Sequence, residues 1–184
     1  MILLACIKAL HAFIHFLIGL YDFSFYRIPN ILLGMLVVLY GFYAPLYLDM
    51  NTFLSSLAIC AGVLVLGFAL FSFKLIGAGD AKYLAVASLW MGTHGILYFL
   101  FIVSLIGGGL GILYLSLPDH MARLSDWTWS KIQNAEERYS YFEYVWAGSG
   151  VGPEKKMRAN VGSRTVPYGI AIAAGAIITV LYRL

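Results

Sequence analysis

The chain has 184 residues, of which 61% are hydrophobic and only 11% are charged. Soluble globular domains carry about 25% charged residues, so this chain cannot cover itself with a polar surface, and a soluble fold is excluded. The net charge of +3 is too small to favour nucleic acid as a partner, and the two cysteines lack the spacing of a zinc site or a disulfide framework. We therefore expect an all-α integral membrane protein embedded in the lipid bilayer.

Apolar stretches recur along the chain, and a helix that spans a bilayer needs about 20 mostly apolar residues. Five stretches meet or approach this length, and a shorter sixth stretch suits a helix that begins inside the protein. The six lie roughly at 2–21, 31–48, 53–73, 80–92, 94–117 and 166–183. Polar breaks containing proline or glycine separate most of them. We predict about six transmembrane helices in a single membrane-embedded domain, residues 1–184, with one long cytoplasmic loop at about 118–165.

The first apolar stretch carries a polar stripe. Lys8, His11, His15 and Asp22 recur at spacings of three, four and seven, which places them on one face of a helix. A polar stripe on a membrane helix faces the bundle interior, so Asp22 should point inward. His11 and His15 could form a metal-binding pair or a proton path. Hydrogen bonds to neighbouring helices are the favoured interpretation, because no further metal ligands appear nearby.

Two of the nine acidic residues stand out. Six lie in the long polar loop and Asp49 lies in a turn, which leaves Asp22 and Asp80 at the ends of apolar stretches. An ionisable group at membrane depth is costly and marks a functional site. Asp80 follows Gly77-Ala78-Gly79, where glycines let the backbone bend, and its carboxylate would meet the amide dipoles of the next helix. The alternative is that Asp80 only caps this helix.

Small residues and aromatic residues suggest how the remaining segments pack. The run from Gly107 to Gly111, and the Ala-x-x-x-Gly patterns that end at Gly62 and Gly175, predict close contacts between helices. The loop at 118–164 combines charges with Trp and Tyr, so its first half is predicted to be a helix at the membrane interface. The alternative for this loop is a docking surface for a substrate or partner.

Basic residues predict the orientation, because the cytoplasmic loops of membrane proteins are enriched in Lys and Arg. With the N-terminus outside, ten of the twelve basic residues fall on the cytoplasmic side, and only Lys8 and Arg183 do not. Asp22 and Asp80 then lie at the same, cytoplasmic, end of the bundle. Lys74 and Lys82 flank Asp80, and both are expected to extend their ammonium groups to the membrane surface.

Three motifs in order resemble those of the bacterial prepilin peptidases, the type IV leader peptidase family of GxGD aspartic proteases. The closest likeness is to the short members that serve tight-adherence (Flp-type) pili. The motifs are Asp22 with Ile28-Pro29-Asn30, then Gly77-Ala78-Gly79-Asp80-Ala81-Lys82, then Val166-Pro167-Tyr168-Gly169.

This resemblance implies a GxGD aspartyl protease bundle in which Asp22 and Asp80 are the catalytic pair. Residues at the same motifs would support the site or bind substrate. They are Gly77, Gly79, Lys82, Arg27, Pro29, Asn30 and Pro167. No metal or organic cofactor is implied. Residues 23–30 leave no room for the cysteine-bearing loop of longer relatives, so their N-methyltransferase activity is not carried over.

The implied function is a membrane aspartic endopeptidase that cleaves the short leader of a prepilin-like membrane protein. The resemblance places the protein in the bacterial inner membrane, with the cut at the cytoplasmic face. One alternative is a presenilin-like intramembrane protease of other substrates. Another is a non-enzymatic membrane transporter or assembly component.

Overall fold

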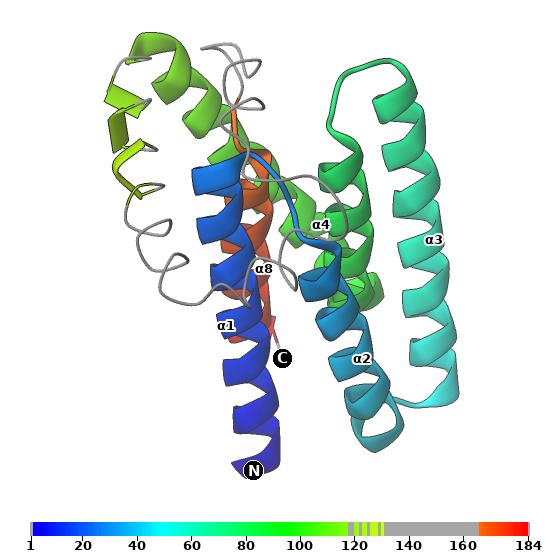
Figure 1. The fold of residues 1–184 in the computed structure, drawn as a ribbon. Coiled ribbons are helices and arrows are strands. Elements are labelled where there is room, and N and C mark those ends of the chain that lie inside the picture. Colours follow the sequence, from blue (N-terminus) through cyan, green and yellow to red (C-terminus); the bar gives the residue numbers. More distant parts are fainter. Residues whose placement is uncertain are drawn as a thin grey trace.

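The described part of the chain is helical (Figure 1). The computed structural model describes residues 2–117 and 166–183, together with 120, 121, 123, 124, 126–128 and 130 between them. The labelled helices are α1 (Ile2–Phe25), α2 (Asn30–Tyr47), α3 (Met50–Ser72), α4 (Ala78–Ser116) and α8 (Tyr168–Arg183). The first four are long and apolar enough to cross a membrane, and α8 is a shorter apolar helix. The prediction of an all-α, multi-pass membrane protein is confirmed.

Helix α4 is a hairpin of two legs, residues 78–91 and 93–116. Gly92 separates them with φ 56° and ψ −168°, a left-handed conformation that glycine adopts without steric cost. Gly92 lies beside Ser56 near the start of α3, whereas Ala81 lies against Gly67 near the end of α3. The first leg therefore runs antiparallel to α3, and Figure 1 shows the second leg returning in the opposite direction. The predicted boundary at Gly92 is confirmed.

Helix α8 packs against both α1 and the second leg of α4. A Cβ at Gly19 of α1 would lie 3.2 Å from the Cβ of Ala173. A Cβ at Gly107 would lie 3.0 Å from the ring of Tyr168, and one at Gly175 would lie 2.6 Å from Val103. Close packing is thus confirmed at Gly107 and Gly175. It is wrong for Gly62 and for the other glycines of the 107–111 run, Gly108, Gly109 and Gly111, where an added Cβ would meet nothing within 4 Å in the described part of the chain.

Helix ends meet at one end of the bundle, which we call the aspartate end and define by the connections 26–29, 73–77 and 166–167. Helix α1 continues for most of a turn beyond Asp22, further than the apolar stretch predicted. It ends where the N–H of Tyr26, with φ 53°, donates to the backbone oxygen of Asp22 at 2.8 Å. Lys74, with φ 60°, follows α3 in the same left-handed conformation. Both connections into the next helix are therefore short and sharply turned.

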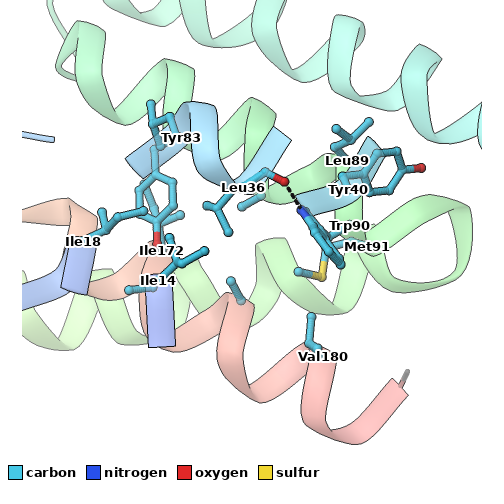
Figure 2. Packing of buried hydrophobic residues seen from close by; sticks show 14 of the residues in the cluster. Ile14, Ile18, Leu36, Tyr40, Tyr83, Leu89, Trp90, Met91, Ile172 and Val180 are labelled. Atoms are coloured by element: carbon cyan, nitrogen blue, oxygen red, sulfur yellow. Dashed lines mark hydrogen bonds between the residues drawn. The ribbon is translucent and has the colours of Figure 1, made fainter. Parts of the chain in front are cut away.

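The core lies between α1, α2, α4 and α8 (Figure 2). Tyr83 has no exposed surface and reaches from the first leg of α4 toward Ile14 and Ile18 of α1 and Ile172 of α8. Trp90 donates its indole N–H to the backbone oxygen of Leu36 at 3.3 Å, which joins this leg to α2. The core thus packs the first leg of α4 against α1, α2 and α8.

The polar stripe of α1 also faces this core. His11 and His15 have no exposed surface, and Asp22 is 4% exposed. The inward direction predicted for the stripe is confirmed at these three positions.

The predicted interfacial helix in the first half of 118–164 falls only partly on described residues. Residues 120, 121, 123, 124, 126–128 and 130 are helical, with Leu124 and Trp127 exposed. Thr128 lies 3.3 Å from the hydroxyl of Ser24, so this helix passes the end of α1. Residues 131–165, including Trp146, lie outside the described residues, and their predicted role stays a prediction.

Packing of α3 on α4 gives a stability test. In Gly67→Leu the new side chain would collide with Ala81, whose Cβ and Cα would lie only 3.0 and 3.2 Å from the added Cβ. We expect a loss of about 1–3 kcal/mol, seen as a lower thermal midpoint in detergent. Gly62→Leu on the same helix is the matched control and should leave the midpoint unchanged or raise it, since leucine favours helix over glycine. Equal midpoints for the two variants would contradict this close packing of α3 on α4.

Candidate functional site

Asp22 is held at the aspartate end by the start of α8. The N–H of Gly169, the second residue of α8, donates to Oδ2 of Asp22 at 2.8 Å. A Cβ at position 169 would lie 2.6 Å from that oxygen, so a larger residue would force the carboxylate or the helix to move. The positive end of the α8 dipole also favours a carboxylate at this place. An otherwise costly buried carboxyl group thus has a backbone donor.

Asp80 is the third residue of α4 and reaches back to the residue before that helix. Its Oδ2 accepts the N–H of Gly77 at 3.3 Å. Gly77 occupies the N-cap position and has no side chain to cap the helix. The Asp80 carboxylate, in the first turn, accepts a free backbone N–H at this end instead. The predicted place in the first turn is confirmed. Asp80 as the N-cap itself is wrong, although its carboxylate does bond a terminal amide.

The two carboxyl groups come from different helices and lie within electrostatic range of one another. Asp22 is buried, whereas Asp80 is partly exposed. Each one meets a backbone amide at a helix start, that of α8 for Asp22 and that of α4 for Asp80. Two carboxyl groups that come close enough to share one proton can present both a proton acceptor and a proton donor to a bound molecule.

The motif Ile28-Pro29-Asn30 lies beside the glycines that precede Asp80. A Cβ at Gly79 would lie 3.5 Å from the Cβ of Ile28. Pro29 is buried at the N-cap of α2, and Pro167 is buried just before α8. The structure therefore brings the three sequence motifs together at the aspartate end.

The polar residues of these motifs lie further from the core. Arg27, Asn30 and Lys82 all have exposed side chains. Lys82 lies two residues after Asp80, between the buried Ala81 and Tyr83, so its side chain leaves the first leg on the outer side. An exposed position agrees with the extension of Lys82 toward the membrane surface.

His11 and His15 form a buried hydrogen-bonded group with the neighbouring helix. Nδ1 of His15 bonds the hydroxyl of Tyr83 in the first leg of α4, and Nε2 of His15 lies 3.0 Å from Nε2 of His11. The favoured interpretation, hydrogen bonding to a neighbouring helix, is confirmed for His15; His11 bonds only His15 of its own helix, and its Nδ1 has no hydrogen-bond partner among the described residues. Within the described residues, no three His, Cys, Asp or Glu side chains come together in a metal-binding group.

Sequence reasoning missed three features of the site. Tyr83 and Tyr114 are buried tyrosines, and both lie within electrostatic range of Asp22. Tyr83 could have been found, since it follows Asp80 by three residues and so shares its helix face. Tyr114 gives no such signal, because the return of α4 after Gly92 brings it back to the aspartate end. The third feature is the N–H of Gly169. It is a backbone group, so the identity of the residue does not predict its role.

Comparison with known proteins identifies a family whose sequence profile matches the chain. Residues 9–112, more than half of the chain, match the sequence profile described as the type IV leader peptidase family. This range includes both aspartates and ends before α8. No curated protein and no solved structure matches the chain significantly.

The contact between Gly169 and Asp22 can be tested by adding one methyl group. In Gly169→Ala the methyl carbon would lie 2.6 Å from Oδ2 and would displace the carboxylate. A misplacement of about 1 Å at a reacting group can lower a rate about 100-fold, and we expect a loss of leader-peptide cleavage on that scale. Gly111→Ala in α4 is the control, because a Cβ there would meet nothing within 4 Å in the described part of the chain. Full activity of Gly169→Ala in a membrane cleavage assay would contradict the role of this contact.

Proposed function

Because the chain belongs to the type IV leader peptidase family, we propose that it is an aspartic endopeptidase with Asp22 and Asp80 as its catalytic pair. The observation that carries the proposal is that these two carboxyl groups lie at one end of the bundle within electrostatic range of each other, each held by a backbone amide. Both groups stand at membrane depth, where ionisable residues are rare unless they have a function.

The reaction needs one ionised and one protonated carboxyl group. Two neighbouring carboxyl groups cannot both ionise at low cost, so the pair holds a single proton. The ionised member takes a proton from a water molecule, whose oxygen attacks the carbonyl carbon of the scissile peptide bond. The protonated member donates a hydrogen bond to the carbonyl oxygen and then protonates the leaving amine as the C–N bond breaks. The two carboxyl groups titrate as a unit, so these roles belong to the pair.

The backbone amides support this chemistry by fixing one oxygen of each carboxyl group. Gly169 holds Oδ2 of Asp22, and Gly77 holds Oδ2 of Asp80. Fixed orientation lowers the cost of bringing the reacting groups together, because the protein has ordered them before substrate binds. The second oxygen of each group is then the one that meets the water and the peptide.

The proposed substrate is a prepilin-like membrane protein of the Flp type, cut at the cytoplasmic edge of the bacterial inner membrane. Arg27, Lys74 and Lys82 lie at the aspartate end, and the predicted topology places seven more of the twelve basic residues on the same side, which favours a cytoplasmic position for it. A short cytoplasmic leader could then approach from the side of Asp80, the more exposed carboxyl group. We assign exposed Arg27, Asn30 and Lys82 to contacts with this leader or with lipid headgroups.

Isosteric substitutions test the catalytic pair. Asp22→Asn and Asp80→Asn keep the size of each side chain but remove its ability to share the proton. We expect each to reduce prepilin cleavage by on the order of 1,000-fold or more, as single losses from a catalytic unit do. Asp49→Asn is the matched control. Asp49 is exposed at the N-cap of α3, where hydrogen bonds from Thr52 hold the pKa of its carboxyl group below the usual range. Asparagine also caps helices well, so this variant should cleave normally.

The products of the same assay separate the rival functions. Normal processing by either Asp22→Asn or Asp80→Asn would contradict the catalytic assignment. Normal processing combined with a failure of transport or pilus assembly would favour a non-enzymatic component. A cut mapped by mass spectrometry inside the membrane span of the substrate would favour a presenilin-like protease.

A further inference from the structure

A buried polar group links α1 directly to the first leg of α4, below the two aspartates. Its members are His11, His15 and Tyr83, and none of the three has exposed surface. The Tyr83 hydroxyl bonds Nδ1 of His15, the two rings stack with centroids 5.5 Å apart, and His15 in turn contacts His11. The proposed reaction uses none of these side chains.

Each end of this link is joined to one aspartate by continuous helix. Asp22 follows His15 by seven positions in α1, a rise of about 10 Å, and Tyr83 follows Asp80 by three positions in α4, a rise of about 5 Å. A helix is stiff over so short a length. An axial shift of α1 along the first leg of α4 would therefore appear directly as a change in the separation of the two carboxyl groups.

Other contacts hold these two helices to different neighbours. Gly19 and Asp22 join α1 to α8, through Ala173 and Gly169. The first leg of α4 is joined to α3 through Gly67 and to α2 through Trp90. Between α1 and the first leg themselves, the rings of His11 and Trp90 lie in contact with centroids 4.4 Å apart, and the bond between His15 and Tyr83 adds a link with a defined direction.

A hydrogen bond can specify an axial position where apolar packing does not. Burying imidazole and phenol groups is costly unless they are bonded, and a hydrogen bond requires defined distance and direction. In a bilayer the surrounding lipid is as apolar as a leucine side chain, so apolar residues favour one offset between helices over another only through the fit of their packing. A buried polar pair loses its bond as soon as the helices slide.

We propose that the hydrogen bond between Tyr83 and His15 sets the axial register of α1 against the first leg of α4 and so fixes the separation of Asp22 and Asp80. Tyr83 and His15 are positioning residues. The effect of this register on cleavage rests on the proposed function, whereas the register itself does not.

Disulfide cross-linking measures the register without any catalysis. In a background of Cys6→Ser and Cys60→Ser, cysteines replace Asp22 and Asp80, and the rate of disulfide formation is measured in membranes with a mild oxidant. Adding Tyr83→Phe keeps the ring but removes the hydroxyl, and we expect the rate to fall at least about 5-fold. The matched control is Tyr40→Phe, since Tyr40 is a similarly buried tyrosine of the same core that bonds neither histidine.

A second cysteine pair separates a shift in register from general loosening. Gly19→Cys with Ala173→Cys reports on α1 against α8, where the two Cβ positions are 3.2 Å apart. Tyr83→Phe should leave the cross-linking rate of this pair unchanged. An unchanged rate at positions 22 and 80, or an equal fall at both pairs, would overturn the proposal.

Cleavage kinetics supply the link to function. With both aspartates present, Tyr83→Phe should lower kcat about 10-fold or more while KM changes little, since the leader still binds. His15→Gln can still bond the Tyr83 hydroxyl and should retain more activity than His15→Leu; equal losses in these two variants would overturn the proposal.

Slower cross-linking in Tyr83→Phe, together with normal cleavage by Asp22→Asn, would support the register and overturn the catalytic assignment instead.

Discussion

The hydrogen bond from the Gly169 amide to Asp22 is the contact on which the architecture of the site depends. A carboxyl group in an apolar bundle needs donors, and here the donor comes from the helix most distant in sequence. The absence of a side chain at Gly169 lets α8 approach closely enough to supply it. The close approach continues along α8. Ala173 of α8 meets Gly19 of α1, and Gly175 of α8 meets Val103 in the second leg of α4. The first and last helices are thereby fixed to one another where the carboxyl group is needed.

Two helix starts perform the same task for the two aspartates. The amide of Gly169 at the start of α8 bonds Asp22, and the amide of Gly77 at the start of α4 bonds Asp80. Helix starts carry free N–H groups and partial positive charge, so they suit carboxylates, both the buried one of Asp22 and the partly exposed one of Asp80. Tyr26 and Lys74, both with positive φ, begin the short connections that follow α1 and α3 at the same end of the bundle. The proposed reaction uses the polarity of the backbone as well as the two side chains.

Much of this arrangement could be predicted from sequence because the signals are local. The inward direction of Asp22 follows from the periodicity of the stripe it shares with His11 and His15. The place of Asp80 in a first turn follows from the glycines before it, and the boundary at Gly92 follows from a break in the apolar pattern. Each of these depends on neighbours within a few residues, where helix geometry is fixed.

The remaining features depend on contacts between distant segments. Gly67 and Gly62 lie five residues apart in α3, yet only Gly67 contacts α4, because the choice depends on where the first leg passes. Tyr114 comes within electrostatic range of Asp22 only because α4 turns back at Gly92. The partner of His15 could be expected to lie on a neighbouring helix, but its identity as Tyr83 required the relative positions of both helices.

The central claim is that Asp22 and Asp80 act as one catalytic unit, and a double-mutant cycle on cleavage tests it most directly. Single-turnover rates would be measured for wild type, for each Asp→Asn variant and for the double variant, all at matched protein levels in membranes. Members of one unit are strongly non-additive, so the account predicts that the double variant is no slower than the slower single variant. Losses that multiply in the double variant would contradict it, because they would show that the two carboxyl groups contribute independently.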